Sequence, residues 1–277
     1  MEIQVVGVSG RHPAASANAP DAIQALSLRI AKGGQIAVIG PSGAGKTTLL
    51  HLLACALRPR AGSVQLDAVD PWAIQRSKLR TLRGRLFLAP QVPPLPPRQR
   101  VVNAVLAGRL PHQSLWASLR SLFYPLDMAL AERALARFDL SEKLFDRVDR
   151  LSGGERQRVG LARALASQAE LFLVDEPLSA LDPTRSHQAI QSLTQAASER
   201  GATLVATLHH VEMALANFPR IVGLRAGVLA FDLPAHQVTP QHLQDLYAQH
   251  LHELTGPALN TADPGPISAL PVVMVCR

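Results

Sequence analysis

Compact apolar runs separated by polar turns predict the strands of this chain. Five runs rich in Val, Ile and Leu have the length and content of buried strands, and they lie at 5–8, 25–30, 35–39, 171–174 and 203–208. A further segment, 220–232, has the pattern of a hairpin. Residues 14–19 form an alanine-rich insertion between the first two strands.

Helix-forming residues fill much of the sequence between these runs. They predict helices at 46–57, 101–110, 128–140 and 153–165. Four prolines within 91–98 predict a stiffened loop without a regular helix. Strands that alternate with helices imply an α/β fold, with a largely parallel sheet and helices on its faces. We expect the mostly helical stretch 91–149 to form a lobe beside that sheet.

The composition supports a sizeable core and a basic surface. Of the 277 residues, 47% are hydrophobic, and 28 Lys and Arg against 21 Asp and Glu leave a net charge of +7. Such a surface favours anionic partners, which include nucleotide phosphates, phospholipid head groups and nucleic acid. A merely basic, soluble surface is the alternative.

Neither a membrane span nor a secretion signal is predicted. No apolar stretch approaches the roughly 20 residues that a spanning helix needs, and the N-terminus lacks a basic-then-apolar layout. Cys55 and Cys276 show no metal-site spacing. Cys55 lies in an apolar helical run, so we expect a buried thiol in a reducing compartment. The expectation is a cytosolic protein that reaches a membrane only through partners.

The strongest chemical signal is a glycine-rich loop between a strand and a helix. It fits G-x-x-x-x-G-K-[ST] without a gap, as Gly40-Pro41-Ser42-Gly43-Ala44-Gly45-Lys46-Thr47. Such a loop curls so that successive N–H groups point into one cavity, and the following helix adds a dipole that favours an anion. We predict that Lys46 reaches the β- and γ-phosphates of a nucleotide and that the Thr47 hydroxyl coordinates Mg²⁺.

Polar residues that end two predicted strands supply the rest of a hydrolytic site. Asp175 ends a strand that we expect next to the phosphate loop, and it is expected to hold Mg²⁺, directly or through water. Glu176 is placed to orient and deprotonate the attacking water, although it could be only a solvated acid at a strand end. His209 follows a strand expected beside the phosphate loop, so we predict a γ-phosphate sensor. The adjacent His210 competes for that role.

The most discriminating string is Leu151-Ser152-Gly153-Gly154-Glu155. A Ser hydroxyl and two glycine amides at a helix start make a second anion-binding surface. Because the one phosphate loop already uses its own helix terminus, this surface is best explained as binding the γ-phosphate held by another copy. A dimer with nucleotide between its halves follows. The alternative, an N-cap by Ser152, leaves the glycines unexplained.

Together these strings resemble the ATP-binding subunits of ABC transporters over roughly residues 1–250. Residues 40–48 resemble the Walker A motif, which adds Thr48 to the nucleotide contacts, and the strings at 151–155 and 171–176 resemble the signature and Walker B. Asp182 ends a string similar to the D-loop and is expected to contact nucleotide. Gln91 matches the Q-loop glutamine, which in the family links Mg²⁺ and water to the membrane subunits. Leu208-His209-His210 resembles the switch segment and favours His209.

The resemblance implies a P-loop NTPase fold. Its parts would be a RecA-like core sheet, an N-terminal antiparallel β region and a helical subdomain at about 92–150. Residues 1–250 would form the ATP-binding domain, and the tail 251–277 has no assigned role. The family stacks adenine on an aromatic residue near the N-terminus, and His12-Pro13 stands at the matching place here. His12 is therefore the candidate adenine contact.

Within the family, the helical region is most similar to that of phosphonate importer ATPases. The likeness rests on 105–110, on Trp116 and Leu122-Phe123, and on 221–227. Ala89-Pro90 before Gln91 and the prolines after it are atypical, so the surface that couples to permeases is less well predicted.

The resemblance implies an ATP hydrolase that uses ATP and Mg²⁺ to energise uptake of a phosphonate or a related phosphorus oxyanion. Its partners would be a second copy of the chain, transmembrane permease subunits and, indirectly, a substrate-binding protein, at the cytoplasmic face of the bacterial inner membrane. No nucleic-acid partner is expected. Alternatives are an exporter ATPase for lipoprotein or a drug, and a soluble ABC ATPase acting on nucleic acid or ribosomes. A small-molecule kinase would have no reason for the string at 151–155.

Overall fold

The computed structural model describes residues 1–12, 15–16, 19–123 and 127–248, and for 115 and 121–123 it describes the backbone alone. The predicted tail 251–277, with Cys276, and much of the insertion at 14–19 lie outside the described residues. Within the described part, no helix has both the length and the apolar character needed to cross a bilayer.

An antiparallel sheet forms from the first part of the chain. Its strands are β1 (Ile3–Gly10), β2 (Ile23–Ile30) and β4 (Ala61–Leu66), in the order β2-β1-β4. Both pairings are antiparallel, which confirms the predicted N-terminal antiparallel region. β4 was not predicted, because only its second half alternates between buried and partly buried positions.

The core sheet has six strands in the order β5-β6-β7-β3-β8-β9. They are β3 (Gln35–Ile39), β5 (Leu86–Ala89), β6 (Leu171–Asp175), β7 (Thr203–Thr207), β8 (Arg220–Arg225) and β9 (Val228–Pro234). Only β8 and β9 pair antiparallel, as the predicted hairpin; the other neighbours are parallel. The predicted α/β fold with a RecA-like sheet is confirmed, and the carboxyl ends of β3, β6 and β7 meet at one edge.

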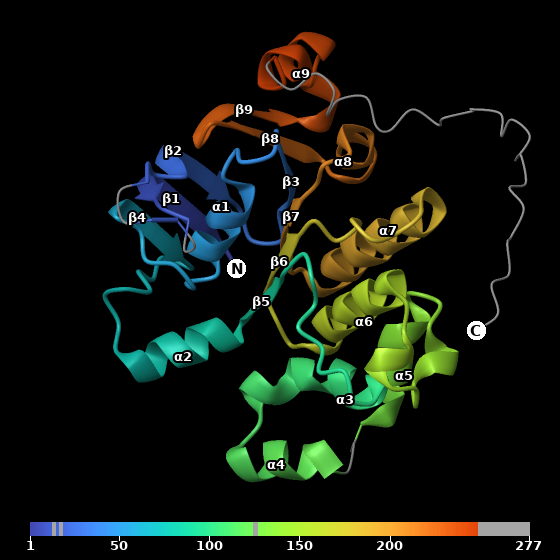
Figure 1. Cartoon of the computed structure of the whole chain (residues 1–277). Helices are drawn as coiled ribbons and strands as arrows, with labels where there is room; N and C mark the ends of the chain where they lie inside the picture. The colour runs from blue at the N-terminus through green and yellow to red at the C-terminus, as the bar shows by residue number, and fades with distance from the viewer. Residues whose placement is uncertain (13–14, 17–18, 124–126, 249–277) are drawn as a thin grey trace, which may run out of the picture.

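Alternating residues of the central strands divide the interior into two cores. Leu171 and Leu173 of β6 face α1 (Lys46–Leu53) and the antiparallel sheet. Phe172 and Val174 face the helices on the other side, among them α6 (Gly153–Ala166), which Figure 1 shows beside α7 (Pro183–Arg200). Because both faces are covered, these strands are apolar throughout, which is why the sequence pattern identified them.

Three predicted helices end earlier than their sequences suggested. α1 ends at Leu53 rather than at 57, because Cys55 takes a left-handed backbone with φ of 54°. Residues 101–110 divide into α3 (Val101–Leu106) and a 3₁₀ turn (Ala107–His112). α5 (Met128–Ala136) ends before Asp139, which has a φ of 53°. Left-handed residues cannot continue a right-handed helix, and single-residue conformations of this kind are not visible in a hydrophobic pattern.

Cys55 is buried, as predicted, although it lies just beyond its helix. Burial raises the pKa of its thiol to about 11. A thiol with such a pKa remains protonated near neutral pH and is a poor nucleophile.

Five helices complete the fold without having been predicted individually. They are α2 (Arg76–Gly84), α4 (Leu115–Phe123), α7, α8 (Val211–Asn217) and α9 (Pro240–Leu246). Short 3₁₀ turns lie at Ser141–Lys143, Val148–Arg150 and Ala235–Gln237. α3 and α5 share one hydrophobic core with α6 and the sheet.

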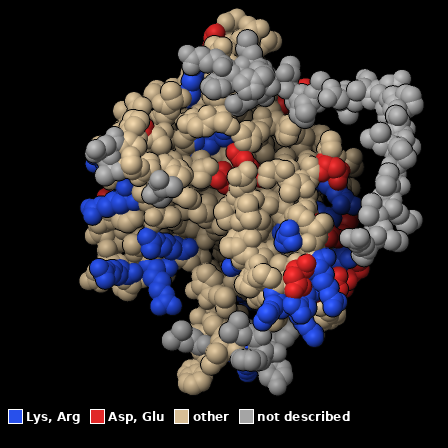
Figure 2. All heavy atoms as spheres, viewed as in Figure 1, with Lys and Arg blue, Asp and Glu red and all other residues tan. Residues whose placement is uncertain are grey.

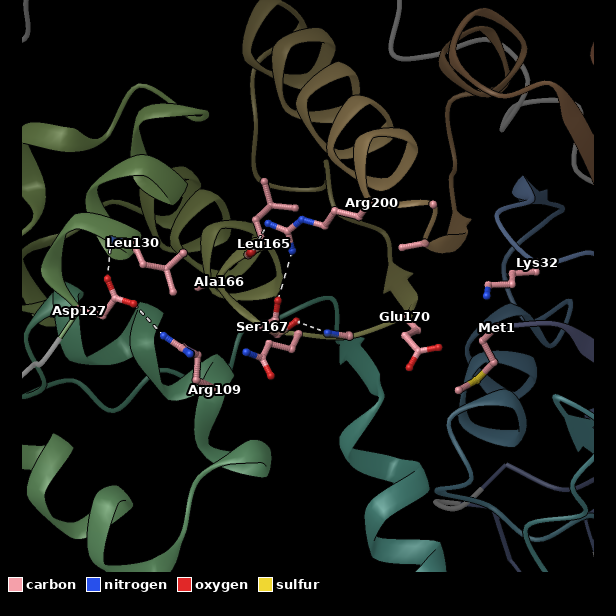
Figure 3. Close-up of a pocket in the computed structure, with 14 residues that line it drawn as sticks. Met1, Lys32, Arg109, Asp127, Leu130, Leu165, Ala166, Ser167, Glu170 and Arg200 are labelled. Carbon is pink, nitrogen blue, oxygen red and sulfur yellow. Dashed lines mark hydrogen bonds and ion pairs between the residues drawn. The ribbon is translucent and has the colours of Figure 1, made fainter.

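A hollow of about 560 Å³ lies at the amino ends of β6 and β7, where α6 and α7 end. Figure 3 shows Arg200 reaching across it, and its guanidinium donates to the carbonyls of Leu165 (2.6 Å) and Ser167 (3.2 Å). These bonds satisfy carbonyls at the end of α6. On the opposite wall Arg109 pairs with Asp127 at 2.7 Å.

Candidate active site

The phosphate loop follows β3 and ends where α1 begins at Lys46. Gly40 and Gly45 have φ of 152° and 100°, a region that side chains rarely enter. A Cβ on Gly40 would lie 2.1 Å from the carbonyl oxygen of Leu224, and one on Gly45 would lie 2.3 Å from that of Ala22. Both glycines are therefore required by backbone conformation and by the close approach of neighbouring chain.

The side chain of Lys46 folds back onto the phosphate loop that precedes it. Its side chain is buried, and its ammonium donates to the carbonyls of Gly40 (2.8 Å) and Pro41 (3.2 Å). This places a positive charge in a concave loop at the N-terminus of α1, an arrangement that favours an anion such as a nucleotide phosphate.

Asp175, the last residue of β6, is joined to the phosphate loop by a hydrogen bond. Its Oδ2 accepts from the Thr47 hydroxyl at 2.8 Å, and its Oδ1 accepts from the Thr207 hydroxyl at 2.6 Å. We expected Asp175 on the strand next to the phosphate loop, but β7 lies between β6 and β3. The side chains span that extra strand, and a hydroxyl beside a carboxylate is a donor set that suits Mg²⁺.

Glu176 contacts both of the other predicted catalytic residues, His209 and Gln91. Its Oε1 lies 2.6 Å from Nε2 of His209, and its Oε2 accepts from the Gln91 amide at 2.8 Å. Its backbone is left-handed, with φ of 46°, and its N–H donates to the Thr207 hydroxyl at 2.9 Å. The backbone turn and this bond aim the Glu176 carboxylate across the carboxyl edge of the sheet.

Electrostatics keep Glu176 ionised. Burial by itself raises the pKa of this carboxyl, but the hydrogen bond and the charge of His209, together with the charge of Lys46, outweigh that effect. The net result is a pKa below the ordinary value. Glu176 is thus an acceptor near neutral pH, already engaged by two donors.

A cavity of about 310 Å³ collects most of the predicted nucleotide contacts. Its lining includes His12, Ser42, Gly43, Ala44, Gly45, Lys46, Thr47, Thr48, Glu176 and His209. His209 lines it and His210 does not, which agrees with the preference for His209. Gly40, Pro41 and Asp175 are not part of the lining, but each accepts a hydrogen bond from Lys46 or Thr47. His12, which is far from the phosphate loop in sequence, is also part of the lining, and its contact with adenine stays a prediction.

The signature string lies apart from this cavity, since none of its residues is part of the lining. Ser152 is the N-cap of α6: its hydroxyl accepts from the N–H of Glu155 at 3.2 Å, and the Glu155 carboxylate accepts from the N–H of Ser152 at 2.7 Å. A Cβ on Gly153 would meet nothing within 4 Å in the described structure. The N-cap role left open by the sequence is therefore present, and the glycine beside it is open to solvent.

The D-loop residue Asp182 also lies outside the cavity. It caps α7 by accepting from the N–H of Arg185 at 3.0 Å. The preceding chain contacts the signature, since a Cβ on Gly154 would lie 2.9 Å from the carbonyl oxygen of Ala180. The signature and the D-loop thus form one surface.

Thr207 bonds to both acids of the candidate site, and the sequence pattern did not single it out. Its hydroxyl donates to Asp175 and accepts from the N–H of Glu176, so it positions both acids. Its place at the end of β7, two residues before His209, was the available signal. A threonine in a strand is ordinarily explained by β propensity, which hid its role.

Comparison with known relatives identifies the family. The profile described as ABC transporter matches residues 23–179, more than half of the chain. The chain is 72% identical to phosphonates import ATP-binding protein PhnC 2 of Albidiferax ferrireducens, over 100% of both chains. It is 52% identical to a phosphonates import ATP-binding protein of Pseudomonas aeruginosa, over 90% of this chain and 91% of that one.

A solved structure agrees with the fold. The dimeric structure of a bacterial ABC transporter cassette matches with a TM-score of 0.73 and 25% identity, over 84% of this chain and 98% of that one. Sequence and fold therefore agree with the resemblance seen in the motifs. The chain belongs to the ABC transporter family, as one of its ATP-binding subunits.

Proposed function

We propose that this chain is the ATP-hydrolysing subunit of an importer for phosphonates or a related phosphorus oxyanion. The observation that carries the cargo class is the 72% identity, over the whole of both chains, to a relative named as a phosphonates import protein. A fold shared by many cassettes could not carry it. Identity of this degree across the helical region as well as the motifs favours a shared transporter type.

ATP would enter the cavity beside the phosphate loop, with its phosphates in the loop and its adenine toward His12. Lys46 would turn from the carbonyls of the loop to the β- and γ-phosphates. Thr47, Asp175 and Gln91 are the proposed holders of Mg²⁺, which when bound would offset phosphate charge. The hydrogen bond between Thr47 and Asp175 already sets two of these groups side by side.

Glu176 is the proposed general base. Its carboxylate contacts both His209 and Gln91, so it must exchange one of these partners for water before it can accept a proton from that water. His209 would then donate to the transferring phosphoryl group, and Gln91 would report the change to the membrane partner. Hydrolysis is thereby tied to movement of the Gln91 loop.

The second half of each site is proposed to come from a second copy. Ser152, Gly153 and Gly154 would bind the γ-phosphate held in the partner's loop, and Asp182 would approach the same nucleotide. This surface lies outside its own chain's cavity, which is what a contact made across a dimer requires.

The assembly that we propose has two copies of this chain beneath transmembrane permease subunits, served by a substrate-binding protein. It would lie at the cytoplasmic face of the bacterial inner membrane. Residues 1–250 would be the ATP-binding domain, with a helical subdomain at about 92–150 that moves with the permease. Residues 251–277 remain without a proposed role.

Transport by the reconstituted complex tests the proposal. The chain is placed in proteoliposomes with the permease and the binding protein of a phosphonate importer, and uptake of labelled methylphosphonate is measured with Mg-ATP. We expect ATP-dependent uptake that the Glu176→Gln variant abolishes. ATP-dependent extrusion of a preloaded drug or lipid, without phosphonate uptake, would instead establish the exporter alternative.

A further inference from the structure

Helix α2 carries a basic patch that the proposed catalytic cycle does not use. The patch consists of Arg76, Lys78 and Arg80, all exposed. Among the described residues, none of the three side chains has a hydrogen-bond or ion-pair partner. Figure 2 shows basic side chains gathered over the position of α2 at the lower left, without acidic ones among them.

The first turn of α2 is unfavourable by the ordinary rules of helix stability. Arg76 and Lys78 stand at its first and third positions, where the helix dipole disfavours cations, and no acidic residue lies in that turn. The N-cap residue, Gln75, makes no side-chain capping bond. The sequence thus places positive charge where a stable helix would carry negative charge.

Repulsion along the helix adds to this cost. Arg76 and Arg80 are four residues apart and lie on one side of the helix, and like charges at that spacing destabilise it. α2 forms despite this repulsion because Leu82 is buried and Leu79 packs against the core around α1. Arg83, in the last turn of the same helix, donates to the carbonyl of Cys55 at 2.6 Å, and Arg85, beyond the helix, is paired with both Asp67 and Glu170. Both of these arginines thus have an acceptor, whereas the three cations of the patch have none among the described residues.

We infer that the α2 basic patch binds the anionic phospholipid head groups of a membrane surface. The exposed residues of α2 are all polar, without the aromatic or apolar anchors that protein interfaces use at their centres. The exposed side chains of α2 include no aromatic ring on which bases could stack, as single-stranded nucleic acid binding requires. A row of cations attracted to a diffuse negative surface needs neither feature.

This inference rests on the proposed function in one respect, which is that the chain works beside a membrane. A covering layer of head groups would relieve the repulsion within α2 and would help to recruit the subunit to its permease. The attraction would be screened within about 8 Å at physiological salt, so it would act only at close approach.

Co-sedimentation of the full chain with vesicles tests the inference. The vesicles are phosphatidylcholine, with or without phosphatidylglycerol, at low and high salt. The test variant carries Arg76→Gln, Lys78→Gln and Arg80→Gln. The control variant, Arg98→Gln, Arg133→Gln and Arg150→Gln, removes the same charge from exposed positions elsewhere. We expect binding only to phosphatidylglycerol vesicles, lost by about 100-fold in the test variant and largely kept in the control.

A second measurement separates this role from a structural one. Because the patch destabilises α2, the test variant should unfold at the same or a higher temperature than the native chain while losing vesicle binding. A large fall in unfolding temperature would assign the three residues to the fold and overturn the inference.

Three binding results would also overturn it. They are absence of binding to phosphatidylglycerol vesicles, equal loss of binding in both variants, and a stronger α2-dependent affinity for single-stranded DNA at equal phosphate concentration.

If patch-dependent binding to permease in pure phosphatidylcholine proteoliposomes equalled that with phosphatidylglycerol, an acidic permease segment would be the partner instead. The vesicle assay contains no permease, ATP or cargo, so its failure leaves the proposed transport function standing, and failed uptake leaves the vesicle result standing.

Discussion

The phosphate-loop half and the signature half that we propose for the nucleotide site are built in opposite ways. In the first, Thr47, Asp175 and Thr207 hold one another through hydrogen bonds at the edge of a buried sheet. In the second, Ser152 stands at an exposed helix start, where its side chain caps its own helix. Beside it, a Cβ on Gly153 would meet no described atom within 4 Å.

The contrast indicates which half one chain can complete. A bonded network at a sheet edge keeps its geometry without a ligand, because each polar group already has a partner. An open helix start has its amide groups directed at solvent, so it acquires a function only when another surface supplies an anion. Four predictions test this difference.

The largest effect on ATP turnover is expected in the phosphate-loop half. Glu176→Gln should lower ATP turnover by about 10²- to 10⁴-fold, the usual contribution of a general base. Glutamine keeps the size of the side chain and one acceptor, so the fold should persist. Phosphate release under saturating Mg-ATP measures the effect. Glu132→Gln, an exposed carboxamide substitution on α5, is the control, and turnover of Glu176→Gln at the native rate would exclude Glu176 as the base.

In the signature half, the Gly153→Ala substitution should leave the stability of the chain unchanged and weaken the assembly of the dimer. The added methyl meets nothing in the isolated chain, so the unfolding temperature should be unchanged or slightly higher. In a dimer the methyl would push the helix start off the partner's phosphate, and turnover should fall by about 10²-fold. Sedimentation in a Glu176→Gln background measures the ATP-bound dimer.

Gly154→Ala provides the matched comparison, because the added Cβ would lie 2.9 Å from the carbonyl oxygen of Ala180, whereas the one on Gly153 meets nothing. It should therefore lose both stability and dimerisation. If Gly153→Ala kept full turnover and dimerisation, the signature would not be the partner's phosphate contact.

A smaller effect is expected where α6 meets the proline-rich loop. A Cβ on Gly160 would lie 2.7 Å from Cγ of Pro93, a rigid ring two residues after Gln91. Gly160→Ala should destabilise the chain by about 1–3 kcal/mol and should lower turnover by displacing Gln91 from Glu176. Adding Pro93→Ala should restore much of both, a coupling that a double-mutant cycle in urea would measure. Additive losses would show that the two residues do not act on each other.

The smallest expected effect is the pH dependence that Glu176 contributes. Its folded pKa lies below the ordinary value of 4.5, so its contribution to stability is full above that value and is lost as the pH falls through the folded pKa. The difference in unfolding free energy between the native chain and Glu176→Gln should therefore shrink as the pH falls from about 5. Urea titrations at several pH values measure it. In a His209→Gln background this loss at low pH should become smaller or reverse, because burial by itself raises the pKa of Glu176 and only the charge of Lys46 then opposes it. An unchanged slope there would exclude His209 as the cause.

The predictable parts of this molecule were those in which residue type and spacing are both constrained. A buried parallel strand must be apolar throughout, so β3, β6 and β7 were visible as runs. The phosphate loop must place glycines where backbone approaches within contact distance, as at Gly40. α2 and α7 were missed because their sequences are mostly polar, although the apolar residues of α7 (Ala189, Ile190, Leu193, Ala196 and Ala197) do recur at helical spacing.

The sequence alone determined the kinds of chemistry available: a phosphate loop, two acids and a histidine at strand ends, and a serine-glycine helix start. Tertiary structure decided which of these meet. The strand order β6-β7-β3 brings Asp175 to Thr47 across an intervening strand and makes Thr207 a shared partner, while the signature is left outside the cavity. The physical reason is that motif spacing constrains only neighbours along the chain, whereas strand order and side-chain reach depend on how both faces of the sheet are buried.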